Sequence, residues 1–393
     1  MSIKLSDRVQ AVKPSPTLAI TARAAEMRAA GKDIIGLGAG EPDFDTPDHI
    51  KAAAVKALDN GFTKYTAVDG IPSLKKAIIN KFKNDNGLDY QPKQILVSCG
   101  GKQSSYNLAQ ALLNPGDEVI IPAPFWVSYP DMVLLADGVP VIIETTQAQQ
   151  FKITPEQLRA AITDKTRLMF INSPSNPSGI AYTLDELKAI GDVLKEFPNI
   201  IIATDDMYEH ILWKKDTFVN ILNAHPDLYD RTVVMNGVSK AYSMTGWRIG
   251  YAAGPIDLIA AMCTIQSQST SNPTSISQVA AEAALTGDQS FIDNMRDEFK
   301  KRHDFVVSEF NKIDGIDCLG TDGTFYVFPN VEKLIERLDN INDDLEFAEY
   351  LIEQAGVALV PGSAFGCPGH IRISIATSMV NLENALERIR NAI

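Results

Sequence analysis

The sequence predicts an α/β protein with a large domain and a smaller, discontinuous α+β domain. Between residues 94 and 253, seven short apolar runs alternate with mostly amphipathic segments. Apolar strands alternating with helices are typical of a mostly parallel sheet covered by helices on both faces. After residue 290, a long charged stretch precedes a mixture of short strands and helices. The chain of 393 residues is long enough for two domains.

The first 47 residues are expected to form an arm and part of the small domain. Two prolines within residues 13–17 exclude a helix there, and an Ala-rich helix is predicted over Leu18–Ala30. A short strand, Asp33–Gly38, follows and runs into Ala39–Pro47, a loop rich in Gly and Pro. Such a loop lets backbone amides approach a ligand closely, although ordinary turn chemistry explains it equally well. We expect the strand to join the small domain.

Residues 48–290 are predicted to form the large, ligand-binding domain. The predicted strands are Gln94–Ser98, Glu118–Pro122, Val139–Glu144, Thr166–Ile171, Ile200–Thr204, Thr232–Met235 and Arg248–Ala253. The predicted helices are His49–Asn60, Ser73–Asn84, Gln103–Leu113, Val127–Leu135, Pro155–Ala161, Leu184–Glu196 and Ile256–Gln266.

Residues 291–393 are predicted to form a linker helix and the rest of the small domain. The linker helix is Phe291–Phe310, which is long and charged. The predicted strands after it are Gly323–Phe328, Val357–Val360 and His370–Ile375. The predicted helices are Leu345–Gln354 and Met379–Ile393.

Composition and charge exclude several classes of function. The net charge of −13 argues against binding to nucleic acid or to an anionic membrane surface. The N-terminus lacks the apolar core of a signal peptide, and no apolar run approaches the length of a membrane span. The four cysteines are scattered and have no CxxC spacing. We therefore expect a cytoplasmic protein with reduced thiols and no metal site.

Ligands of open parallel sheets bind outside the carboxyl ends of the strands, so the residues after each strand are the candidates. Cys99–Gln103 places two glycines at a helix start, which is a weak signal for an anion site. Trp126 offers a flat surface for stacking, and the alternative is that it is a core residue. Two prolines in 172–179 fix the amide of Asn176. Asp205 begins an acidic pair that could hold a metal or face a ligand.

Lys240 lies in a loop of small and hydroxyl residues between two apolar runs, with Arg248 eight positions later. In most proteins a lysine after a strand is solvated. If this loop is buried, the lysine pKa falls, which is what an amine needs to attack a carbonyl and form a Schiff base. The surrounding strand ends decide between these interpretations.

Together the strand ends offer the groups that pyridoxal phosphate requires. This cofactor needs an amine for its aldehyde, an anion site for its phosphate and a carboxylate on its pyridinium nitrogen. Lys240, the glycines after the first strand and Asp205 can supply these. Asn176 and Tyr208 can donate to the 3-oxygen of the ring.

Seven segments carry a resemblance to a known family, and they extend from the arm to the final helix. They are Gly38–Pro47, Lys64-Tyr65 with Asp69–Pro72, Gly100–Gln103, Phe125–Pro130, Ser173–Pro177, Ser239–Gly250 and His370–Arg372. Over its whole length the chain resembles the class I aminotransferases of fold type I, which depend on pyridoxal phosphate, and within them the bacterial aspartate aminotransferase branch. Asp206 departs from the pattern, since Glu is expected there.

The resemblance implies a role in cofactor binding for residues from several strand ends. Lys240 resembles the Schiff-base lysine that also moves the proton between the substrate Cα and the cofactor. Asp205 is implied to contact the ring nitrogen, and Asn176 and Tyr208 the 3-oxygen. Trp126 is implied to stack on the ring face. The implied phosphate ligands are Gly101, Lys102, Ser239 and Arg248. Tyr65 resembles a phosphate ligand donated by a second subunit, which implies a homodimer.

The resemblance also implies the reaction, a ping-pong transfer of the amino group of L-aspartate or L-glutamate to 2-oxoglutarate or oxaloacetate. Arg372 resembles the clamp on the substrate α-carboxylate, aided by Asn176, Trp126 and the Gly40 backbone, since guanidinium pairs bidentately with carboxylates. Lys102 resembles the contact to the distal carboxylate; alternatively, it only neutralises the phosphate. Thr17 resembles an arm residue linked to prephenate use. The alternative function is an aminotransferase that prefers aromatic residues, alanine or methionine.

Overall fold

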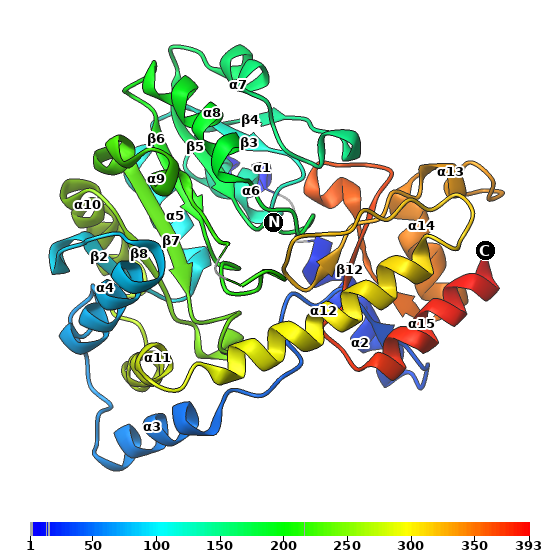
Figure 1. Ribbon diagram of the computed structural model, residues 1–393, viewed down its shortest axis with the longest axis horizontal. Coiled ribbons are helices and arrows are strands. Elements are labelled where there is room, and N and C mark those ends of the chain that lie inside the picture. The colour runs from blue at the N-terminus through cyan, green and yellow to red at the C-terminus, as the bar shows by residue number, and fades with distance from the viewer. Residues whose placement is uncertain (1–2, 13, 15, 216) are drawn as a thin grey trace.

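The computed structural model describes residues 3–12, 14, 16–215 and 217–393. The chain forms a larger body around one sheet and a smaller body around short strands (Figure 1). Helix α12, Ser290–Phe310, runs along both bodies and connects them. This helix was predicted to within one residue.

The larger body contains a seven-stranded sheet in the order β2-β8-β7-β6-β5-β3-β4. Its strands are β2 Ile95–Ser98, β3 Glu118–Pro122, β4 Val139–Ile143, β5 Thr166–Asn172, β6 Ile201–Asp205, β7 Thr232–Gly237 and β8 Gly250–Ala253. Only β8 runs antiparallel to its neighbours, β2 and β7. The prediction of a mostly parallel seven-stranded sheet is confirmed.

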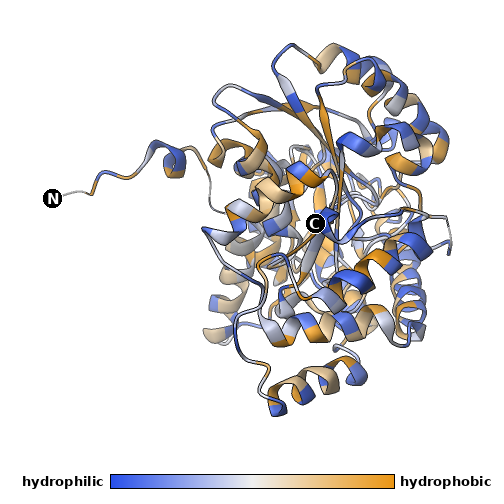
Figure 2. Cartoon of the chain, turned by 90° about the vertical axis from the view of Figure 1, so that its left-hand side faces the viewer, coloured by the Kyte–Doolittle hydropathy of each residue, from blue (hydrophilic) through white to orange (hydrophobic). Residues whose placement is uncertain are grey.

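Helices cover both faces of this sheet because successive strand residues point to opposite sides. Val97, Ile171 and Val234 belong to the core on one face, whereas their chain neighbours Leu96 and Phe170 belong to the core on the other face. Figure 2 shows the apolar residues concentrated in the interior. The helices of the larger body are α3 Asp48–Asp59, α4 Pro72–Asn86, α5 Gly101–Leu112, α6 Ser128–Leu135, α7 Pro155–Ala161, α8 Leu184–Lys195, α9 Ile221–Ala224, α10 Ile256–Ser267 and α11 Ser275–Thr286. Helix α3 lies away from the sheet and packs on α11 (Figure 1).

The smaller body combines segments from both ends of the chain. Strand β1, Ile35–Gly36, pairs in parallel with β10, Val357–Ala358, so the early strand joins the C-terminal region as expected. The antiparallel sheet β11-β12-β9 comprises Val360–Pro361, Ile371–Ser374 and Tyr326–Val327. Helices α13 Glu332–Ile335, α14 Asp344–Tyr350 and α15 Met379–Ala392 complete this body. The division of the chain after residues 47 and 290 stays a prediction.

The structure corrects three predicted strands. The predicted strand Val357–Val360 is two strands in different sheets, because Leu359 is the point at which the chain leaves β10 for β11. The strand predicted over Gly323–Phe328 is only β9, since Gly323 instead forms an isolated bridge with Leu212. The last strand of the large sheet begins at Gly250, because Arg248 is left-handed with φ +57°.

The N-terminal arm projects beyond the rest of the chain (Figure 2). It contains α1, Asp7–Ala11, which was not predicted and whose N-terminus is capped by the Ser6 hydroxyl. Helix α2, Pro16–Ala29, follows. The prediction that residues 13–17 exclude a helix was wrong for Pro16 and Thr17, because a proline is tolerated in the first turn of a helix. Across the part of the chain that the structure describes, no helix combines the length and apolarity needed to cross a bilayer.

Candidate active site

A cavity of about 360 Å³ opens at the carboxyl ends of the large sheet. Every predicted site residue except Tyr65 lines it. The strand-end loops after β2, β3, β5, β6 and β7 supply most of these residues, as the strand-end rule predicts. The loop after β1, helix α2 and strand β12 supply Gly40, Thr17 and Arg372, so both bodies build the cavity. The sequence did not reveal Val127, Ser128, Asn172, Met207 and Tyr326, which also line it.

Lys240 follows β7, and its Nζ donates to the Gly40 carbonyl oxygen at 2.6 Å. The lysine pKa is lowered from 10.5 to about 8, chiefly by burial; the positive charges of Arg248 and Arg372 also lower the pKa, and the negative charges of Glu41 and Asp205 oppose this shift. A large fraction of this amine is therefore neutral at mildly alkaline pH. A neutral amine can act both as a nucleophile and as a base.

Asp205 ends β6, and both of its carboxylate oxygens are held. The Tyr129 hydroxyl donates to Oδ2 at 2.6 Å, and the Met207 amide donates to Oδ1 at 3.3 Å. Burial raises the pKa of Asp205, whereas these two hydrogen bonds and the charge of Lys240 lower it. The sequence did not reveal Tyr129, which is almost completely buried and looks like a core aromatic. The result is an oriented carboxylate that can accept a hydrogen bond from a ring N–H.

The start of α5 forms the cationic end of the cavity. Its N-cap is Gly100, with φ +86°, and no side chain caps the helix, so its first amides can bind an anion. A Cβ on Gly100 would lie 2.3 Å from Arg248 Nη2, so only glycine lets the guanidinium approach this closely. Arg248 is held by the carbonyl oxygens of Thr245, at 2.9 Å, and Cys99, at 3.3 Å. Ser239 is buried and adds a hydroxyl to the lining.

Arg372 is only 2% exposed and is held from several sides. Nη1 donates to Asn176 Oδ1 at 2.9 Å, and Nη2 donates to the Gly38 carbonyl oxygen at 2.7 Å. The guanidinium carbon lies 4.4 Å from the centroid of Tyr326 and 4.9 Å from that of Phe365. Its Nε is buried and has no hydrogen-bond partner among the described residues. An anion in the cavity would satisfy this donor.

Asn176 and Tyr208 place two further polar groups on the cavity wall. The Asn176 side-chain oxygen accepts from Arg372, so its amide nitrogen remains as a donor. The Tyr208 hydroxyl lies 3.1 Å from the Tyr326 hydroxyl. Burial raises the pKa of Tyr208 well above 10, so it keeps its proton and can donate it.

Lys102 and Thr17 add a cation and a free hydroxyl to the lining. The Lys102 Nζ lies 5.1 Å from the centroid of the Trp126 ring, a cation–π distance. Burial, and then the charge of Arg248, lower the Lys102 pKa. The Thr17 Oγ1 is buried and has no hydrogen-bond partner within the described chain.

Tyr65 is the predicted site residue that the single chain does not bring to the cavity. It lies between α3 and α4 and is 91% exposed. Arg8, an arm residue whose charge adds to that of the arm, pairs with Asp137 at 2.7 Å and does not line the cavity. Lys13, the other basic arm residue of interest, lies outside the described residues.

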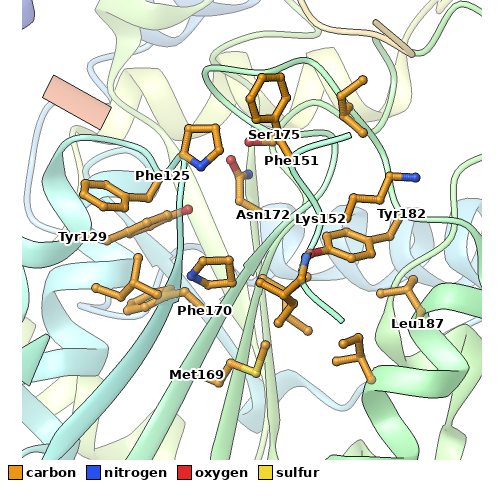
Figure 3. A pocket seen from close by; sticks show the side chains of 17 residues that line it. Phe125, Tyr129, Phe151, Lys152, Met169, Phe170, Asn172, Ser175, Tyr182 and Leu187 are labelled. Carbon is orange, nitrogen blue, oxygen red and sulfur yellow. The ribbon is translucent and has the colours of Figure 1, made fainter. Parts of the chain in front are cut away.

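A second cavity of about 30 Å³ lies behind Tyr129 and Asn172. Figure 3 shows Phe125, Tyr129 and Phe170 on one side of it and Tyr182 and Leu187 on the other. This volume corresponds to about one water molecule, so it is too small for a substrate. A third cavity, of about 490 Å³, is lined by Asp85, Glu209 and His210 among others and by none of the predicted site residues. The cavity of about 360 Å³ is therefore the candidate active site because of its lining and not because of its size.

One group of possible metal ligands lies apart from the candidate active site. Oxygen or nitrogen atoms of Asp85, Glu209 and His210 lie within 4.8 Å of one another. Glu209, however, is ion-paired with the buried Lys81 and accepts from Asn236 at 2.8 Å. The Lys81 ammonium already takes the place that a metal ion would have at Glu209, so this cluster is better explained as a buried charge network.

Comparison with known proteins identifies what this chain is similar to. Residues 32–389 match the model of the family "Aminotransferase class I and II". The aspartate/prephenate aminotransferase of Nitrosomonas europaea is 62% identical over 392 residues, covering 98% of this chain and 99% of the relative. The aspartate aminotransferase structure from Rhizobium meliloti superimposes with a TM-score of 0.96 at 49% identity, covering 100% of this chain and 99% of that one. The Thermus thermophilus aspartate aminotransferase with maleate gives 0.94 at 42% identity, with both chains fully covered.

Proposed function

The chain belongs to the class I and II aminotransferases, and on that basis we propose that it is an aspartate aminotransferase that depends on pyridoxal 5′-phosphate. It would transfer the amino group of L-aspartate or L-glutamate to 2-oxoglutarate or oxaloacetate in a ping-pong cycle. The observation that carries the proposal is the position of Lys240, whose pKa is lowered to about 8, in one cavity with the two arginines Arg248 and Arg372.

The residues of the cavity fit the cofactor. The uncapped start of α5, with Ser239 and Arg248, offers donors and positive charge for a phosphate. Asp205 would hold the proton on the ring nitrogen, and its two hydrogen bonds keep the carboxylate in place. Asn176 and Tyr208 would donate to the ring 3-oxygen. Trp126 would lie against the ring face.

Pyridoxal phosphate, when bound, supplies an aldehyde that condenses with amines and a protonated ring that delocalises the electron pair left at the substrate Cα. Lys240 would hold the aldehyde until an amino acid displaces it. Its free Nζ would then accept the proton from Cα and deliver it to the neighbouring cofactor carbon. The lowered pKa supports this role, because a permanently charged ammonium could not accept that proton.

Arg372 would bind the substrate α-carboxylate. Two of its nitrogens are already held by Asn176 and by the Gly38 carbonyl oxygen, so the orientation of the guanidinium is fixed before the substrate arrives. The unpartnered Nε gives it a donor for the ligand. A fixed guanidinium orients the substrate Cα–H toward Lys240 at little entropic cost.

Preference for dicarboxylates is supported by the remaining groups of the cavity. Lys102 supplies a second cation and Thr17 an unpartnered hydroxyl, in addition to Arg372. Solved relatives include an aspartate aminotransferase with the dicarboxylate maleate. Prephenate also carries two carboxylates, and the names of several relatives include it, so it is proposed as an additional acceptor.

The test of this function is a panel of single amino acids added to the cofactor-loaded protein, with the visible absorbance of the cofactor as the readout. Aspartate and glutamate should each convert the cofactor, and 2-oxoglutarate, oxaloacetate or prephenate should reverse the change. If both acidic donors fail while phenylalanine, alanine or methionine succeeds, the alternative aminotransferase is correct. A protein that gains no visible band with pyridoxal phosphate would contradict the cofactor itself.

A homodimer in which Tyr65 binds the phosphate of the partner's cofactor is also proposed. The exposure of Tyr65 outside its own cavity supports it. The test mixes two variants, Lys240→Ala and Tyr65→Ala, under conditions that exchange subunits. If Tyr65 acts across the interface, each hybrid contains one intact site and activity reappears. If a verified hybrid shows no recovery of activity, Tyr65 does not act in the site of the partner subunit. Cytoplasmic localisation stays a prediction.

A further inference from the structure

Tyr326 lies where three groups of the candidate site meet. It belongs to β9 of the smaller body, and its ring packs under the Arg372 guanidinium at 4.4 Å. Its hydroxyl lies 3.1 Å from the Tyr208 hydroxyl, which comes from the loop after β6 of the larger body. A Cβ on Gly40, whose carbonyl oxygen accepts from Lys240, would lie 3.0 Å from the same hydroxyl. Tyr326 therefore contacts the substrate clamp, the ring-oxygen donor and the lysine support.

The direction of the hydrogen bond between the two hydroxyls follows from the number of protons available. In the protein alone either tyrosine can donate. A tyrosine hydroxyl has one proton and can also accept. Under the function proposed above, Tyr208 uses its proton on the 3-oxygen of the cofactor. The proton between the two hydroxyls must then come from Tyr326.

We propose that Tyr326 is a positioning residue whose hydroxyl donates to Tyr208 and so directs the Tyr208 proton into the cavity. The inference rests on the proposed function and deepens it. A hydroxyl that accepts one hydrogen bond becomes a stronger donor of another. Tyr326 thereby strengthens the bond from Tyr208 to the ring oxygen without touching the cofactor.

The charges around the pair are consistent with a directed chain of two hydroxyls. Arg372 and Asp205 face Tyr208, and Arg372 and Glu41 face Tyr326. Burial raises the pKa of both tyrosines, so both hydroxyls keep their protons. The positive charge of Arg372 acts to lower the pKa of both tyrosines, so it strengthens both hydroxyls as donors and does not itself set the direction of the bond between them.

The test uses Tyr326→Phe, Tyr208→Phe and the double variant of the cofactor-loaded protein. Tyr326→Phe keeps the ring under Arg372 and removes only the hydroxyl. The readouts are the pH midpoint of the visible absorbance of the cofactor and the affinity of the cofactor-free protein for pyridoxal phosphate. Since the deprotonated ring oxygen loses part of its stabilisation, Tyr326→Phe should raise the midpoint by about half a pH unit and weaken cofactor affinity about threefold. Tyr208→Phe should have a larger effect, and the double variant should match Tyr208→Phe alone.

Two results would overturn the inference: an unchanged midpoint in Tyr326→Phe, or the same added shift when the Tyr326 substitution is made in the Tyr208→Phe background. The second result would mean that Tyr326 does not act through Tyr208. Maleate affinity checks the clamp and should change less than about twofold, because the stacked ring remains; a larger loss would show that the hydroxyl also supports Arg372, which would contradict a role that runs through Tyr208. A wild-type protein without a cofactor band would instead refute the proposed function, and this inference with it.

Discussion

The cost of keeping the Lys240 amine in its cavity can be measured by comparing the cofactor-free protein with Lys240→Met. Methionine has similar length but carries no charge. Burial lowers the lysine pKa from 10.5 to about 8. At about 1.36 kcal/mol per pH unit, protonated Lys240 should destabilise the folded state by about 3 kcal/mol at pH 7.

The sign of the pH dependence follows from the bound protons. Between pH 8 and 10.5 the unfolded lysine binds more protons than the folded one, so the stability of the wild-type protein rises with pH across this window. Lys240→Met lacks this rise. The stability advantage of the variant should therefore shrink by about 2 kcal/mol between pH 7 and pH 10.

Urea denaturation at a fixed protein concentration measures this difference, because a fixed concentration holds any subunit association constant. Lys301→Met is the matched control, since the Lys301 side chain is 71% exposed on α12. Its stability difference from the wild type should stay constant to within about 0.5 kcal/mol. A pH-independent difference for Lys240→Met as well would refute the account of a buried, easily deprotonated amine.

Three further substitutions separate the functions of the other groups. Arg372→Leu should lower kcat/KM by about a hundredfold or more for aspartate and alanine alike, because a buried, oriented donor to the shared α-carboxylate is lost; steady-state kinetics with both donors would expose a selective loss. Lys102→Ala should weaken dicarboxylates by about tenfold and leave alanine unaffected; equal losses in the same kinetics would exclude a distal role. Tyr129→Phe should move the acid limb of the pH–rate profile upward by about one pH unit, because a bond that lowers the pKa of Asp205 is removed; an unmoved limb would contradict that coupling.

The sequence predicted the sheet and the residues at its strand ends because both depend on local patterns. Apolar runs between amphipathic helices are read directly from the chain, and the strand-end rule then selects Asn176, Asp205 and Lys240. Helix α11, Ser275–Thr286, was not predicted, because its buried residues are mainly small Ala and Ser, which give a weak apolar pattern. The short strands of the smaller body were predicted less well, since tertiary pairing, not periodicity, defines them.

The parts of the site that the sequence did not reveal are made by contacts between distant segments. Tyr129 and Tyr326 both lie in aromatic or apolar stretches that favour a core assignment, and both rings are indeed buried. Only the fold places their hydroxyls against Asp205 and Tyr208. The available signal for such a role is a tyrosine in a stretch where phenylalanine would pack equally well. A buried hydroxyl needs a hydrogen-bond partner, so the tyrosine indicates a polar group nearby.

The central claim is that Lys240 holds the cofactor. Reduction of the pyridoxal-phosphate-loaded protein with borohydride would fix the linkage, and mass spectrometry of the digested chain would locate it. We predict one reduced cofactor per chain, attached to the peptide that contains Lys240 and absent from Lys240→Ala. Attachment at Lys102 or at another lysine, or no attachment in a protein that still transaminates, would contradict the account.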